Sequence, residues 1–176
     1  SDIKNILEGE NRLNELVGFT TPEFGKNFSA TFNVIKEKDG LDDASSFSLK
    51  YKTTNIYAAL ALDSKVEGYD SYRFSFQIPL NKAKLGLMFQ TSKEVNTGDK
   101  EEGYVVSLSR KITNKGTIKL QLAESDIKLV SGKQTSFGYD REISKKVKIF
   151  IFYTNLSSPK VEKEKNITAV GFELKF

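Results

Sequence analysis

The chain has 176 residues, of which 38% are hydrophobic and 28% are charged, and its formal net charge is +4. The lack of cysteine and histidine excludes disulfides, Cys-ligated metals, thiol nucleophiles and a Ser-His-Asp triad within the chain. The extra lysines are scattered rather than clustered, so nucleic acid is not an expected partner. We expect no enzyme, no cofactor and no metal site.

After a lead-in over residues 1–12, the hydrophobic pattern predicts a series of strands. Alternation of apolar and polar residues, which is typical of strands with one apolar and one polar face, is clean at 28–34, 46–51, 71–78, 82–89 and 118–122. Weaker alternation predicts six more strands at 13–21, 54–62, 103–112, 134–142, 146–154 and 166–176. No run of apolar residues approaches the length of a membrane-spanning helix, about 18 residues.

The links between these strands are predicted to alternate in length. Short links are expected at 22–25, 52–53, 80–81, 113–115 and 144–145, and longer, charged links at 36–44, 63–70, 92–102, 124–133 and 155–165. An up-and-down meander has this rhythm when its two ends meet different environments, as in transmembrane barrels. Soluble sandwiches and small soluble barrels have no reason to segregate their links in this way.

The large residues of the clean strands share one face. They are Phe28, Phe32, Phe47, Phe74, Phe76, Leu85, Leu87 and Phe89. A soluble ligand-binding β-barrel would place them in a packed interior, whereas a membrane pore would place them outside against lipid. A third interpretation is a non-conducting structural or adhesive outer-membrane barrel that acts through its loops. The alternation by itself leaves these interpretations open.

Two stretches of the sequence are similar to a known family. The first runs Asn11-Arg12-Leu13-Asn14 and then Val17-Gly18-Phe19-Thr20-Thr21-Pro22-Glu23-Phe24-Gly25, and the second is Val170-Gly171-Phe172-Glu173-Leu174-Lys175-Phe176. Both resemble the general trimeric porins of Gram-negative bacteria. The first resembles the exit from the constriction loop into the sixth strand, although Glu15-Leu16 departs from the usual Asn and Ser. The second resembles the last strand, which ends in Phe.

The resemblance implies an all-β fold, an antiparallel up-and-down transmembrane β-barrel of about sixteen strands. Residues 1–12 would be the end of the constriction loop, and residues 13–176 would be strands six to sixteen. The function it implies is an outer-membrane porin for passive diffusion of small hydrophilic solutes and ions. The implied partners are the lipid bilayer, two further copies in a homotrimer, and the barrel-assembly machinery, which would read Phe176.

The resemblance also implies a loop inside the lumen that faces basic residues on the wall. The loop remnant would contribute Glu8 and Glu10, with Arg12 where the loop meets the wall. Strand parity places a set of basic residues on the wall: Lys50, Arg73, Lys84, Lys119 and Lys148. The clearest inward acid is Glu173. We expect either a modest anion preference or a lumen that these lysines merely keep wet.

An odd number of antiparallel strands cannot close an ordinary up-and-down barrel, because the first and last strands would run parallel. An open sheet would leave two unpaired edges in lipid, at a prohibitive cost. We therefore expect five further strands to precede Ser1 in a longer protein. A closed barrel made of these residues alone would contradict that expectation.

Overall fold

The computed structural model describes residues 6–7, 15–36, 43–127, 132–158 and 164–175. Within these residues the secondary structure consists of strands only: β1 (Leu16–Thr20), β2 (Phe28–Ile35), β3 (Ala44–Lys52), β4 (Tyr57–Val66), β5 (Tyr69–Leu80), β6 (Ala83–Glu94), β7 (Lys100–Lys111), β8 (Gly116–Ser125), β9 (Gly132–Glu142), β10 (Val147–Ser157) and β11 (Lys165–Leu174). This part of the chain holds no helix long and apolar enough to cross a membrane.

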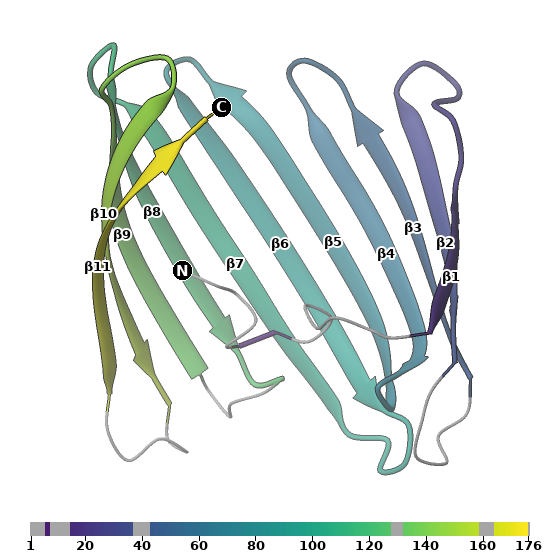
Figure 1. Cartoon of the computed structure of the whole chain (residues 1–176). Helices are drawn as coiled ribbons and strands as arrows, with labels where there is room; N and C mark the ends of the chain where they lie inside the picture. Colours follow the sequence, from purple (N-terminus) through teal and green to yellow (C-terminus); the bar gives the residue numbers. More distant parts are fainter. Residues whose placement is uncertain (1–5, 8–14, 37–42, 128–131, 159–163, 176) are drawn as a thin grey trace.

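The strands form one antiparallel sheet in which each strand pairs with its neighbours in sequence. Figure 1 shows this sheet curving from β1 at one margin to β11 at the other. Among the described residues, β1 pairs only with β2 and β11 only with β10, so the sheet is open. The predicted all-β fold with eleven antiparallel strands is confirmed.

The two faces of the sheet differ in chemistry as the alternation predicts. On one face, Phe19 pairs with Phe32, and Phe32 pairs in turn with Phe47. Large apolar side chains of this face remain open to the surroundings, with Phe19 at 63% and Phe172 at 75% exposure. We call this the outer face. The opposite, inner face carries small polar side chains and most of the long cations, and several of its polar residues are buried.

The predicted length of two links was wrong. The segment 63–70 is almost entirely strand, because β4 continues to Val66 and β5 begins at Tyr69. Glu67 and Gly68 both have positive φ, 51° and 84°, which suits the tight turn that joins twisted strands. The segment 92–102 is likewise shortened by β6 and β7. Charged residues there sit on strands that extend past the apolar part of the sheet, so charge was a poor guide to loops.

Among the described residues of this single-layered sheet, the buried apolar side chains form two small clusters. One joins Ile35, Ala44 and Val66 near one end of β2, β3 and β4. The other includes Ile6 and Leu7 from the N-terminal segment, which pack on the inner face. A sheet with few buried apolar side chains and a large exposed apolar face is suited to contact with the hydrocarbon of a lipid bilayer.

Candidate functional site on the inner face of the sheet

Arg73 belongs to a hydrogen-bonded row on the inner face of β5 and β6. Its Nε and Nη2 donate to Gln90 Oε1 at 2.9 and 2.6 Å. Gln90 Nε2 donates to Ser92 Oγ at 3.1 Å, and Ser92 Oγ lies 2.8 Å from Ser71 Oγ. Gln90 is only 1% exposed. The register pairs Arg73 with Gln90 and Ser71 with Ser92, so these contacts follow directly from strand pairing.

A network of ion pairs crosses the inner face of β8 to β11. Asp140 Oδ2 lies 2.6 Å from Lys119 Nζ and 3.9 Å from Lys148 Nζ. Lys148 Nζ also lies 2.5 Å from Glu173 Oε2 on the last strand. The β10–β11 register places Lys148 opposite Glu173. The network therefore joins four neighbouring strands, and its two lysines are largely neutralised.

Lys50 and Lys84 face the same side of the sheet without an ion pair to any described acid. Lys84 borders a hollow of about 440 Å³ whose lining includes Gln77, Lys119 and Asp140. It also borders a second hollow of about 540 Å³, with Gln77 again in the lining. The positive charge of Lys84 thus lies between two hollows of the inner wall.

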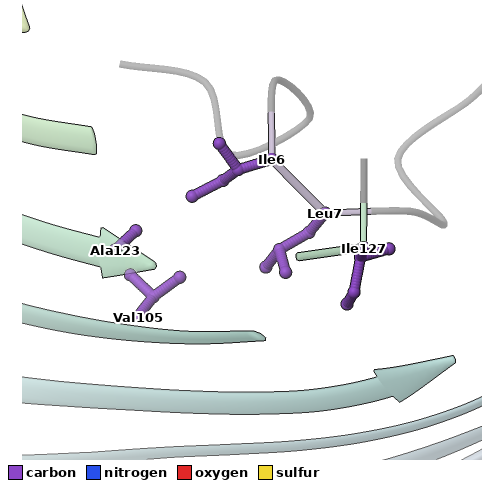
Figure 2. Close-up of a cluster of buried hydrophobic side chains, with 5 residues drawn as sticks. All are labelled: Ile6, Leu7, Val105, Ala123 and Ile127. Atoms are coloured by element: carbon purple, nitrogen blue, oxygen red, sulfur yellow. The ribbon is translucent and has the colours of Figure 1, made fainter. Parts of the chain in front are cut away.

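An apolar patch interrupts this polar wall. Val105 and Ala123 point inward from the paired strands β7 and β8, and with Ile127 they bury Ile6 and Leu7 completely, each at 0% exposure. Figure 2 shows the five side chains gathered beside the ends of the strands. Met88 and Leu156 pack against the rim of this cluster. The N-terminal segment is thereby attached to the inner face at residues 6–7.

The described structure brings together some of the predicted wall residues and leaves others apart. Lys119 and Lys148 share Asp140 as a partner, and Lys84 lines the same hollow as these two lysines, whereas Lys50 and Arg73 do not line that hollow. The remaining predicted residues, Glu8, Glu10, Arg12 and Phe176, lie outside the described residues.

Asp140 was missed by the sequence analysis. The residues Gln134, Ser136, Gly138 and Asp140 alternate with Phe137 and Tyr139, and this period-two pattern could have placed the carboxylate on the polar face. The structure also shows that Asp63 shares the inner face with Lys50, since it pairs with Ser46 of β3. The wall therefore carries more acid than the sequence suggested.

The described residues contain no group of three or more acidic, cysteine or histidine side chains placed to hold a metal ion. What the inner face provides is a curved, polar surface with charges of both signs, and the outer face provides a continuous apolar one. A sheet with these two faces separates water from hydrocarbon.

The sequence matches the family of Gram-negative porins over residues 7–160. The chain belongs to the Gram-negative porin family. Family membership places this porin chain in the bacterial outer membrane, and the family is one of channels rather than enzymes. No curated protein sequence matched the chain.

Solved structures of porins share the fold of the chain. An anion-selective porin from Comamonas acidovorans superposes with a TM-score of 0.74 at 20% identity, covering 93% of this chain and 60% of that one. A porin refined at 1.8 Å resolution gives a TM-score of 0.73 at 12% identity, with 97% and 65% covered. The NanC porin gives 0.54 at 8% identity, with 92% of both chains covered. The porin chain thus spans less than two thirds of the first two structures.

Proposed function

We propose that the protein containing this chain is a porin that forms a water-filled pore for passive diffusion of small hydrophilic solutes and ions. The observation that carries the proposal is the sorting of side chains between the two faces. Phe19, Phe32 and Phe74 are exposed on the outer face, while Gln90, Ser92 and Gln134 are buried on the inner one. In a soluble barrel the bulky residues would fill the interior and the polar ones would face solvent.

Reconstitution into planar bilayers tests this proposal. The full-length protein is expected to give stepwise, non-saturating ionic currents, and liposomes that contain it are expected to swell in isosmotic small sugars. A non-conducting structural or adhesive barrel would insert without current. A soluble ligand-binding barrel would remain monodisperse without detergent, and either result would refute the porin function.

We propose that residues 13–176 form strands six to sixteen and residues 1–12 the end of the constriction loop. Support comes from the two open margins at β1 and β11, which would leave a row of unpaired backbone groups in hydrocarbon. Five further strands would pair with both margins. The full-length protein is then expected to show heat-modifiable migration in detergent gels, a property of closed barrels, and the isolated chain is expected to lack it.

We propose a homotrimer and recognition of the C-terminal strand by the barrel-assembly machinery. Support comes from the alternation of Val170, Phe172 and Leu174 toward the outer face before the terminal Phe176. Deletion of Phe176 is expected to lower the amount of assembled porin in the outer membrane while leaving refolding from urea into detergent unchanged. Light scattering with correction for detergent would reveal the subunit number, and a monomer would refute the trimer.

We propose a modest anion preference, carried mainly by Lys84 and Lys50, with Arg73 as a further wall cation. Lys119 and Lys148 contribute less because Asp140 and Glu173 neutralise them. Glu8, Glu10 and Arg12 are proposed to face this wall at the constriction. Lys84→Gln is expected to shift the reversal potential in a KCl gradient toward cation selectivity. The control Lys145→Gln, in the link between β9 and β10, is expected to shift it less.

A further inference from the structure

The inner wall carries several apolar residues among its polar ones: Ile35 and Ala44 on β2 and β3, Phe150 and Phe152 on β10, and a patch that contacts the N-terminal segment. Two inward positions on paired strands, Val105 and Ala123, are apolar, and Ile127 completes the patch just beyond β8. In a water-filled pore an exposed apolar patch would be unfavourable. Here Ile6 and Leu7 cover it and are themselves fully buried. The presence of apolar residues at these wall positions is thus accounted for by their contact with Ile6 and Leu7.

The side chain of Leu7 packs closely against the wall at Gly103. A Cβ added to Gly103, which is next to the patch on β7, would lie 2.7 Å from Leu7 Cδ2. It would also lie 2.6 Å from Ser125 Oγ on the neighbouring strand. A side chain at position 103 would require Leu7 or Ser125 to shift, so glycine at this position favours the close approach of Leu7.

We propose that Val105, Ala123 and Ile127, with Gly103 beside them, form an apolar seat for Ile6 and Leu7 that determines how far the N-terminal segment narrows the pore. The inference rests on the proposed porin function. Val105 and Leu7 are thereby positioning residues. Neither side chain carries a charge, and each acts by holding the segment against the wall.

Gln134 is a buried polar residue that lies next to the apolar patch. This residue lies opposite Ala123 in the β8–β9 register and opposite Leu156 in the β9–β10 register. It is 1% exposed, and neither polar atom of its amide finds a hydrogen-bond partner among the described residues. A buried amide without partners is unfavourable.

Two substitutions of the same type test the seat in the full-length porin. Val105→Thr adds a hydroxyl within the seat at nearly constant volume, and Val106→Thr makes the same change one residue away on the outer face. We expect Val105→Thr and Leu7→Asn each to raise single-channel conductance about 1.2-fold or more, with noisier open-pore current, because conductance follows the free cross-section. Val106→Thr is expected to leave both unchanged.

A cross-link gives a second readout that does not depend on current size. The chain has no cysteine, so Leu7→Cys with Val105→Cys supplies a unique pair within it. We expect oxidation to join the two residues and to abolish the fluctuations of open-pore current. Unchanged conductance and noise in Val105→Thr and Leu7→Asn, or failure of the pair to cross-link, would overturn the seat while wild-type currents would still support the porin function. Absence of any wild-type current would overturn both.

Discussion

Removal of the Asp140 carboxylate is expected to make the pore more anion-selective. This carboxylate lies 2.6 Å from Lys119 Nζ and 3.9 Å from Lys148 Nζ on the inner face. Asp140→Asn keeps the size of the side chain and its ability to accept hydrogen bonds. It leaves the two ammonium groups with one negative charge fewer beside them, so passing anions are attracted and passing cations repelled more strongly.

The size of the effect follows from Coulomb's law. A monovalent ion passing a unit charge at roughly 6 Å in water interacts with it by about 0.7 kcal/mol. Screening reduces this to about 0.4 kcal/mol in 0.1 M salt and about 0.1 kcal/mol in 1 M salt, where the Debye lengths are about 10 and 3 Å. Because anion and cation shift in opposite directions, the permeability ratio should change about fourfold in 0.1 M salt and about 1.4-fold in 1 M salt.

The assay is the reversal potential of the reconstituted full-length porin under a KCl gradient, repeated at both ionic strengths. The matched control is Glu124→Gln, which also removes an ion-paired carboxylate, 3.4 Å from Lys133 Nζ, but on the outer face. An equal shift in Asp140→Asn and Glu124→Gln would refute the assignment of Asp140 to the pore wall. So would a shift in Asp140→Asn that does not fall with added salt.

Three further predictions concern the free energy of unfolding, measured by urea titration of the full-length porin in lipid vesicles. Phe74→Arg on the outer face should lower it by about 2–4 kcal/mol because the cation would enter hydrocarbon, and Ser75→Arg on the inner face should cost far less; equal losses would contradict the assignment of the faces. Gln134→Leu should raise it by about 1 kcal/mol by removing an amide that lacks partners, and a decrease would contradict this. Gly171→Ala should lower it by about 1–3 kcal/mol, because the new Cβ would lie 2.5 Å from Phe150 Cζ, and Phe150→Leu in the same chain should restore most of the loss.

The sequence predicted the strands well because alternation is a local property. Successive side chains of an extended backbone point to opposite sides, so Phe28, Phe32 and Phe47 could be assigned to one face without knowledge of their neighbours. The same rule failed for links, since residues at 63–70 alternate less clearly and carry charge. Charged side chains occur on strands wherever these extend beyond the apolar zone, and β4 and β5 do so before turning at Glu67 and Gly68.

The charged residues of the inner wall show what strand parity can predict and what it cannot. Parity placed Lys119 and Lys148 on the polar face, as the structure has them, but it could not show that both contact Asp140. That contact depends on the pairing of β8 with β9 and of β9 with β10. A shift of one residue in either register would turn the carboxylate to the other face.

By itself, then, the sequence determined the number of strands, their two-faced character and the absence of thiol and imidazole chemistry. Those features depend on composition and on a repeat of two residues. Only the tertiary structure decided that the bulky side chains lie on the outer face, that Asp140 joins two lysines, and that Leu7 enters the wall beside Gly103. These three features depend on sheet curvature, on strand register and on contacts between residues far apart in the chain. Such long-range contacts produce no repeating pattern in the sequence, so the sequence alone could not predict them.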